Sequence, residues 1–256
     1  MTLRALVRRP SPRLAEGLLT HLDRTPVDAD LAVRQWEGYV ATLAAEGWEI
    51  VEVPPAEDCP DSAFVEDTVV VYDDLAVISR PGAVERQPET AGTEQTLAGL
   101  GFRIARIEEP GTLDGGDVLK HDGRVWVGLG GRTNQAGVDQ LAHLLSPLGA
   151  TVVGVPLTKV LHLKSAVTAL PDGTVIGYAP LVDDVTAWDP FQPVPEEPGS
   201  HVVLLGGETV LMSSAAPRSR QLFEESGLRV VTVDISEFEK LEGCVTCLSV
   251  RLRHAP

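Results

Sequence analysis

Short apolar runs alternate with longer amphipathic stretches along the whole chain, in a pattern that occurs four times. Each copy begins with an apolar strand, continues through a helix-like stretch and ends with a glycine followed by an alternating strand. Glycine suits the left-handed backbone position that ends a helix, and alternation of apolar and polar residues is typical of a half-buried strand. The first strands lie at 5–7, 75–78, 125–127 and 210–212, and the last strands follow Gly47, Gly101, Gly149 and Gly227.

A fifth unit is predicted between the third and the fourth. Two more strands are expected at 166–170 and 174–178, without a convincing helix, and we expect the Pro-rich stretch 190–198 to replace that helix. Five units of about 50 residues fall in the range in which repeats produce propellers or arrays.

An ordinary βαβ sheet is the alternative, because it also alternates strand and helix. No Gly-rich phosphate loop opens any predicted helix, and the pairs Gly115-Gly116 and Gly206-Gly207 precede strands instead. We therefore predict a single closed α/β domain over residues 1–256, with approximate five-fold repetition and no linker.

Composition and charge narrow the classes of partner. The formal net charge of −16 disfavours nucleic acid and anionic membrane surfaces as partners. No apolar run approaches the roughly 20 residues that a membrane-spanning helix needs, and the opening MTLRALVRRPSP lacks the apolar core of a signal peptide. Three cysteines do not make a disulfide framework. We therefore expect a cytoplasmic protein that acts on a small molecule.

Candidate chemistry begins with the segment 242–250, in which Cys244 and Cys247 are three residues apart. A zinc site would need two more ligands at matching spacing, and none of the six histidines forms a pair with these cysteines. A thioredoxin-like pair opens a helix, whereas Leu248 and Val250 alternate with polar residues as in a strand. Spacing alone therefore favours two buried cysteines that pack as small apolar side chains.

Three other sets of polar residues are ambiguous when they are taken singly. His162 stands between two apolar stretches, where a satisfied structural histidine is commoner than a catalyst. Asp114 and Asp117 flank a Gly-Gly step that a simple turn would explain. Glu66 and Asp67 precede an apolar run, and on their own they indicate no more than a polar strand edge.

Taken together, six segments in the same order resemble the dimethylarginine dimethylaminohydrolase family, whose length this chain also matches. A set of six collinear motifs is far more specific than any one of them. The segments are FVED at 64–67, ISRPGA at 78–83, LDGGDVL at 113–119, VGLGGRTNQ at 127–135, LHLKS at 161–165 and EKLEGCVTCLS at 239–249.

The resemblance implies the pentein fold, a five-bladed α/β propeller of guanidine-modifying enzymes, in agreement with the predicted repeat. It implies hydrolysis of asymmetric dimethylarginine or monomethylarginine to citrulline and an alkylamine, through a covalent thiouronium intermediate and without metal or organic cofactor. By position, Cys247 is the implied nucleophile, His162 the general acid and base, and Asp114 the acid that orients His162. The implied substrate contacts are Glu66 and Asp67 on the guanidinium, Asp61, Phe64 and Leu241 in the pocket wall, Arg86 and Arg132 on the carboxylate, and Leu18 and Leu19 in an N-terminal lid.

Two other functions were weighed against this one. An arginine deiminase of the same fold would act on another guanidine, but that family is longer and carries a helical insertion for which this chain has no room. A non-catalytic binding protein for cationic amino acids would not need the thiol of Cys247. The preferred methylarginine, a homodimeric state and the roles of Cys59 and Cys244 are left open by the sequence.

Overall fold

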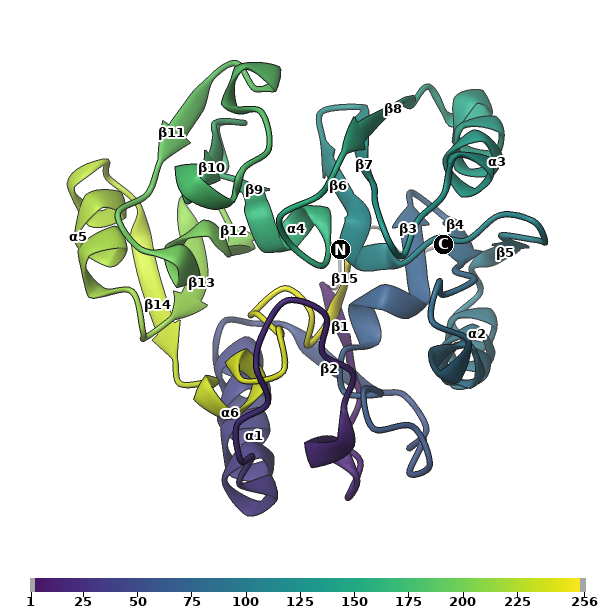
Figure 1. Ribbon diagram of the computed structural model, residues 1–256, viewed down its shortest axis with the longest axis horizontal. Helices are drawn as coiled ribbons and strands as arrows, with labels where there is room; N and C mark the ends of the chain where they lie inside the picture. Colours follow the sequence, from purple (N-terminus) through teal and green to yellow (C-terminus); the bar gives the residue numbers. More distant parts are fainter. Residues whose placement is uncertain (1–2, 254–256) are drawn as a thin grey trace.

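Five three-stranded sheets stand around a common centre in the computed structural model, which describes residues 3–253 (Figure 1). In every sheet the middle strand pairs with one antiparallel strand and with one parallel strand. The antiparallel partner lies toward the centre of the molecule and the parallel partner toward its outside (Figure 1). The predicted five-bladed α/β propeller is confirmed.

The five sheets follow one another along the chain, and only the first recruits a strand from the other end of the sequence. In order from the inner to the outer strand, the sheets are β15 (Val250–Leu252), β1 (Arg4–Val7) and β2 (Glu49–Glu52); β3 (Val69–Tyr72), β4 (Leu75–Ile78) and β5 (Arg103–Arg106); β6 (Val118–His121), β7 (Arg124–Leu129) and β8 (Thr151–Pro156); β9 (Val167–Ala169), β10 (Val175–Gly177) and β11 (Phe191–Pro193); and β12 (Val203–Gly206), β13 (Thr209–Ser213) and β14 (Arg229–Val233).

Four sheets connect their middle and outer strands through a helix. Two of these helices begin at a side-chain cap: Asp28 accepts the N–H of Leu31 at 2.9 Å, and Asn134 accepts the N–H of Gly137 at 2.9 Å. Such caps satisfy backbone donors that the first turn leaves unpaired. The helices are α1 (Ala29–Ala45), α2 (Thr90–Gly99), α3 (Gln135–Leu145) and α5 (Pro217–Glu225), and two shorter ones are α4 (Leu163–Ala166) and α6 (Ser236–Glu239).

The four glycines that were expected to end helices all adopt positive φ. Their φ angles are 86° at Gly47, 91° at Gly101, 81° at Gly149 and 91° at Gly227. A side chain is disfavoured in this backbone region, so glycine allows the chain to turn sharply into the outer strand. The prediction that a glycine precedes the outer strand in each of these four repeats is therefore confirmed.

The fourth sheet lacks a connecting α-helix, as expected, but the expected reason was wrong. Two 3₁₀ turns, Ala179–Leu181 and Val185–Ala187, take the place of the helix, and the Pro-rich stretch supplies the outer strand β11. Proline is tolerated on an edge strand because the missing N–H is not needed there.

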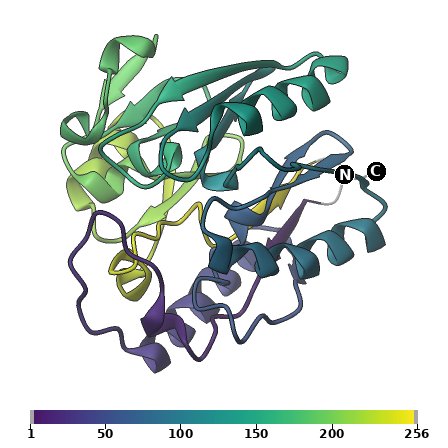
Figure 2. The ribbon, with the colours of Figure 1, turned by 45° about the vertical axis from the view of Figure 1, so that its right-hand side comes forward.

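The ring closes where β1 and β15 pair antiparallel, with Leu6 opposite Val250 (Figure 2). Val250 and Leu252 are buried in the short strand predicted after Cys247. This closure places residue 247 at the centre of the propeller, at the entry to an inner strand.

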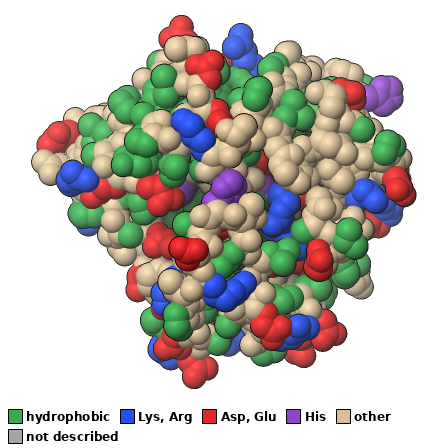
Figure 3. Space-filling view, in the orientation of Figure 1, with side chains coloured by type: hydrophobic (Ala, Val, Ile, Leu, Met, Phe, Trp, Pro, Cys, Tyr) green, Lys and Arg blue, Asp and Glu red, His purple; other side chains and the backbone are tan. Residues whose placement is uncertain are grey.

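The described surface shows acidic and basic side chains interspersed over one face of the propeller, with small apolar areas between them (Figure 3). Among residues 3–253, no helix combines the length and the apolar character needed to cross a bilayer.

Candidate active site

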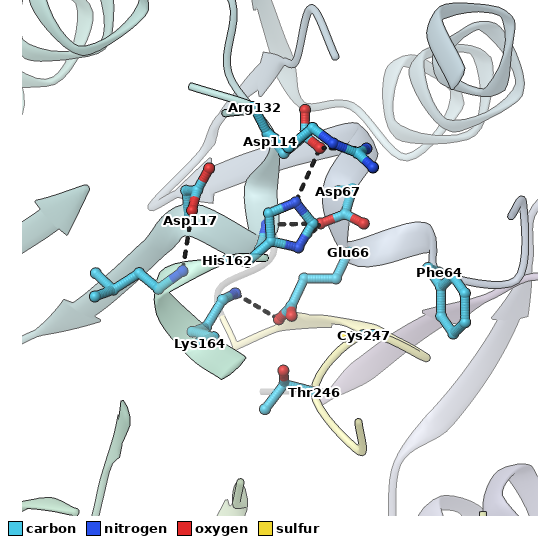
Figure 4. Close-up of polar contacts among 12 residues, drawn as sticks. Phe64, Glu66, Asp67, Asp114, Asp117, Arg132, His162, Lys164, Thr246 and Cys247 are labelled. Carbon is cyan, nitrogen blue, oxygen red and sulfur yellow. Dashed lines mark hydrogen bonds and ion pairs between the residues drawn. The ribbon is translucent and has the colours of Figure 1, made fainter. Parts of the chain in front are cut away.

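The polar residues singled out by the sequence reach the centre from equivalent points of four sheets. The segment 64–68 leads into β3, Asp114–Asp117 into β6, His162 through α4 into β9, and Cys247 into β15. Each of these strands is the inner strand of its sheet, so residues far apart in sequence meet around one axis (Figure 4).

A narrow, nearly filled cavity gathers most of the predicted site residues. Asp114, Glu66 and Leu19 are the predicted residues that do not line it. Its walls are formed by Leu18, Asp61, Phe64, Asp67, Arg86, Arg132, Leu161, His162, Leu241, Glu242, Gly243 and Cys247.

Asp114 does not line the cavity and contacts the imidazole of His162, which does. Its Oδ2 atom is 2.9 Å from Nε2 of His162, and its Oδ1 atom accepts the N–H of Gly82 at 2.9 Å. Nη1 of Arg132 is 3.7 Å from the same Oδ2 atom. The Asp114 carboxylate is fully buried. It holds Nε2 of His162, and the other ring nitrogen, Nδ1, lies 3.7 Å from Oδ1 of Asp67.

The charge state of His162 is set by its acidic neighbours. Burial alone would lower the pKa of His162, but the charge of Asp67 and the hydrogen bond to Asp114 outweigh burial and raise the pKa to about 9. Burial likewise opposes ionisation of Asp67, whereas His162 and Arg86 favour it, and the pKa of Asp67 falls to about 2. The structure therefore holds an imidazolium beside a carboxylate near neutral pH.

Arg86 occupies the cavity wall but is already neutralised by two carboxylates. Its Nη1 donates to Oδ2 of Asp67 at 2.6 Å, and its Nε and Nη2 atoms donate to the two oxygens of Glu89 at 3.1 and 2.8 Å. A guanidinium whose nitrogens already donate to two carboxylates has few N–H groups free to bind another carboxylate. The structure thus does not present Arg86 as the free carboxylate ligand that was expected.

Arg132 is placed differently, because its guanidinium approaches a carboxylate only at ion-pair distance and makes no short hydrogen bond to it. Its Nη1 is buried and has no hydrogen-bond partner among the described residues, and its nearest carboxylate is that of Asp114 at 3.7 Å. A buried guanidinium donor without a partner is costly, so the site is suited to an incoming anion.

Glu66 does not join Asp67 in the cavity, in contrast to the expected pair of guanidinium ligands. Its Oε1 lies 2.6 Å from Nζ of Lys164 and 2.7 Å from Nη2 of Arg251, and Figure 4 shows the contact with Lys164. Adjacent residues of a 3₁₀ turn project about 120° apart, so Glu66 and Asp67 of the turn Val65–Thr68 face different sides.

Cys247 lies on the cavity wall with Cys244 directly behind it. The two sulfur atoms are 3.3 Å apart, and the N–H of Cys247 donates to the carbonyl of Cys244 at 3.1 Å. The contact with Cys244, burial and the negative charges of Glu66 and Asp67 together raise the pKa of the Cys247 thiol above its usual range. In the absence of a bound cation, Cys247 is therefore a thiol.

Two residues that were not predicted as site residues fix the position of His162. Asp117 is buried, and it accepts the hydroxyl of Thr133 at 2.6 Å and the N–H of Leu163 at 3.0 Å. Burial, opposed by His162 and Thr133, raises the pKa of Asp117 to about 7. Both residues stand in quoted motifs, but only the fold shows that their side chains meet.

Gly116 allows the segments to approach each other. A Cβ atom at Gly116 would lie 2.5 Å from Oδ1 of Asp67 and 2.7 Å from Nδ1 of His162. The N–H of Gly116 also donates to the same Asp67 oxygen at 2.8 Å. A side chain here would push the imidazole and the carboxylate apart.

The N-terminal loop covers the cavity and is tied down at two points. The N–H of Leu18 donates to Oδ2 of Asp61 at 3.0 Å, and the carboxylate of Glu242 accepts the N–H groups of Thr20 and Leu22 at 2.9 and 3.0 Å and also that of His21. Of the two leucines expected in the lid, Leu18 lines the cavity.

Leu19 instead packs, half-buried, against the hydrophobic core that includes Phe64 and Leu241. Glu242 was not predicted as part of the lid. No pattern in the sequence points to Glu242, because its partners are backbone groups more than two hundred residues away.

One group of side chains offers a geometry that a metal ion could use. Donor atoms of Asp67, Asp114 and His162 lie within 4.8 Å of one another. Asp67 already accepts the N–H of Gly116, and Asp114 accepts the N–H of Gly82. Asp114 and His162 are hydrogen-bonded to each other. Hydrogen bonds and ion pairs within the chain therefore account for this cluster.

No protein-family model matches this chain. Among curated proteins, the chain is 62% identical to an N(G),N(G)-dimethylarginine dimethylaminohydrolase of Streptomyces coelicolor, over 98% of this chain and 97% of that protein. It is 34% identical to the protein of the same name from Pseudomonas aeruginosa, over 96% of this chain and 98% of that protein.

Solved structures give the same result. A dimethylarginine dimethylaminohydrolase adduct with S-methyl-L-thiocitrulline matches with a TM-score of 0.91 and 32% identity, over 98% of this chain and 100% of that one. The Pseudomonas aeruginosa enzyme complexed with citrulline matches with a TM-score of 0.90 and 31% identity, over the same shares. The N-terminal domain of a cyanobacterial arginine dihydrolase shares the fold, with a TM-score of 0.87 at 21% identity, over 99% of this chain and 98% of that one.

Proposed function

This chain belongs to the dimethylarginine dimethylaminohydrolase family, and we propose that it hydrolyses Nω-methylated arginine to citrulline and an alkylamine by attack of Cys247 on the guanidinium carbon. The arrangement that carries this proposal is the single cavity in which Cys247, His162 and Asp67 meet. A thiol, a charged imidazole and a carboxylate are the groups that guanidine hydrolysis needs.

The cavity wall carries groups that suit a flat cation and a group that suits a carboxylate. Asp67 and Asp61 place two carboxylates on the wall, and the ring of Phe64 offers an apolar face beside them. Carboxylates can hold a guanidinium in a fixed plane through paired hydrogen bonds. The guanidinium of Arg132, which also lines the cavity, would bind the carboxylate of the amino-acid substrate.

The resting thiol of Cys247 makes the reaction dependent on its substrate. A bound guanidinium adds a positive charge beside the sulfur, lowers the pKa of the thiol and favours the thiolate that attacks. Only a correctly placed cation would therefore generate the nucleophile. Positioning against Asp67 brings the guanidinium carbon within reach of the sulfur.

His162 starts in the protonated form that the first step requires. As the C–N bond to the alkylamine breaks, the imidazolium gives its proton to the leaving nitrogen, and the carbon stays bonded to sulfur as a thiouronium. The neutral imidazole then takes one proton from water, which attacks the same carbon and breaks its bond to sulfur. Citrulline is released, and the second proton restores Cys247 to the resting thiol. Asp114 keeps the ring oriented and stabilises its charged form in both steps.

The test is to incubate the purified protein with asymmetric dimethylarginine, monomethylarginine and arginine in parallel, and to measure citrulline, alkylamine and ammonia. We expect citrulline and alkylamine from the methylated substrates, and no turnover by Cys247→Ser. Faster release of ammonia from arginine than of amine from methylarginine would contradict the proposed substrate, while undiminished turnover by Cys247→Ser would contradict the proposed nucleophile.

A further inference from the structure

We propose that Cys244 and Cys247 form a reversible disulfide when a peroxide reaches the substrate cavity, and that this bond protects Cys247 from irreversible oxidation. The hydrolysis described above leaves Cys244 without a role. Its sulfur nevertheless lies 3.3 Å from that of Cys247, closer than to any other sulfur or oxygen partner except Thr246 Oγ1 at 3.2 Å.

The backbone already has the geometry that a disulfide between these residues needs. The hydrogen bond from the Cys247 N–H to the Cys244 carbonyl closes a four-residue turn, in which the first and last Cα atoms lie within about 7 Å. Disulfides bridge Cα atoms that are about 4.4–6.8 Å apart. The sulfurs need to approach by just over 1 Å to reach a bond length of about 2.05 Å, which side-chain rotation can supply.

The two cysteines differ in their access to the cavity. Cys247 lines the cavity, whereas Cys244 is 3% exposed and does not contribute to its walls. The hydrogen bond from Cys247 lowers the pKa of Cys244 to about 5, against the effect of burial and with help from the nearby His201. A small oxidant therefore meets Cys247 first, and a partner with thiolate character stands behind it.

The chemistry uses one peroxide for each disulfide. The Cys247 sulfur, its proton passed to Cys244 or to solvent, attacks one peroxide oxygen, so that an S–O bond forms and the O–O bond breaks to release hydroxide. The Cys244 thiolate then attacks the sulfenic sulfur of Cys247, so that an S–S bond forms and the S–O bond breaks to release a second hydroxide. The protons that the two cysteines have given up, one from each and carried through solvent where the thiol was already ionised, convert both hydroxides to water, and the two sulfurs together lose two electrons to the peroxide.

The competing fate of Cys247 is oxidation beyond the sulfenic acid. A second peroxide would convert it to the sulfinic acid, which thiols do not reduce. A resolving sulfur 3.3 Å away acts within the molecule, whereas the second peroxide must diffuse in from solution. Disulfide formation should therefore outrun overoxidation in the native chain, and it should fail when Cys244 is replaced.

The experiment treats the full-length protein with hydrogen peroxide and follows both mass and activity, before and after dithiothreitol. Cleavage after Lys240 and Arg251 yields LEGCVTCLSVR, residues 241–251, which contains both cysteines in one peptide. We expect this peptide to lose two hydrogen atoms on oxidation and to regain them on reduction. This measurement does not depend on the hydrolase activity, whereas the activity measurement rests on the proposed role of Cys247.

Matched variants separate the proposed bond from general oxidation. Cys244→Ser should instead gain oxygen at Cys247, and it should recover roughly tenfold less of its own starting activity with dithiothreitol than the native protein recovers. Cys59→Ser, which removes the buried cysteine of the loop after β2, should behave as the native protein. Equal recovery in native and Cys244→Ser proteins, or a peptide that gains oxygen without forming the disulfide, would overturn the proposal.

Discussion

The Nε2 atom of His162 lies 2.9 Å from the Oδ2 atom of Asp114, and this hydrogen bond joins the entries of two neighbouring blades. Both side chains are buried, so water cannot replace either partner. The imidazole is therefore held through Nε2, while Nδ1 faces Asp67 at 3.7 Å and is the nitrogen available for the proposed proton transfer.

Replacement of Asp114 by Asn should lower kcat much more than it raises KM. The amide preserves the shape but removes the charge that supports the imidazolium, and loss of a positioned acid or base costs roughly 10²–10⁴-fold. Steady-state kinetics with asymmetric dimethylarginine measure the effect. A variant that raises KM alone would show that Asp114 acts on substrate binding.

The raised pKa of His162 should appear as a dependence of stability on pH. The pKa rises from its ordinary 6.5 to about 9 on folding, so the stabilising contribution is fully present below about pH 6.5 and is lost as pH rises through about 9. Its size is on the order of 3 kcal/mol, at about 1.4 kcal/mol for each pKa unit.

Urea unfolding at about pH 6 and about pH 9.5 measures this contribution. The loss of unfolding free energy between the two pH values should be larger in the native protein than in His162→Gln. His143→Gln, which alters an exposed histidine of α3, should match the native protein. The same pH dependence in all three proteins would contradict the assignment of the shift to His162.

The Glu242 carboxylate should control how tightly the N-terminal loop closes. Glu242→Gln weakens the charge-assisted acceptor for three backbone N–H groups, so we expect KM to rise by several-fold to roughly tenfold. Trypsin should also cut faster at Arg24, which lies in the same loop. Glu208→Gln, in the exposed turn between β12 and β13, is the control. Unchanged KM and unchanged cleavage would show that the loop closes without Glu242.

The buried pair of Arg86 and Glu89 should contribute to stability in a way that an exposed pair does not. Glu89→Gln leaves Asp67 as the one carboxylate that forms an ion pair with Arg86 among the described residues, and breaking a buried ion pair costs about 3–5 kcal/mol. Glu94→Gln, which breaks the largely exposed pair with Arg106, should cost less than about 1 kcal/mol. If urea titration gave the same free energy of unfolding for Glu89→Gln and Glu94→Gln, the buried pair would not stabilise the fold more than the exposed pair does.

Local signals were sufficient for the repeat, whereas most of the site was predicted only from the resemblance to a known family. Gly47, Gly101, Gly149 and Gly227 mark equivalent helix ends because the backbone conformation there excludes most other residues. Proline was harder to interpret, since the stretch 190–198 looked like a break but contains an edge strand. A missing N–H excludes a helix interior and a central strand, but not an edge.

The sequence did not show in which direction each side chain points. Glu66 and Asp67 are neighbours with the same chemistry, yet only Asp67 lines the cavity, because the short turn that holds them sends Glu66 to Lys164 and Arg251. Spacing of the two cysteines indicated buried, packed side chains, and both do lie in the hydrophobic core. The spacing did not show that their sulfurs are 3.3 Å apart beside the cavity.

The pairing of β1 with β15 has a consequence for synthesis of the chain. β1 is translated before the other strands that the structure describes, and its partner on the inner side is translated after all of them. An open strand edge invites pairing with other chains, so the nascent protein carries an aggregation risk until translation reaches its last strand. The segment that bears Cys247 is translated just before that strand, so the thiol joins His162 and Asp67 only when the ring closes.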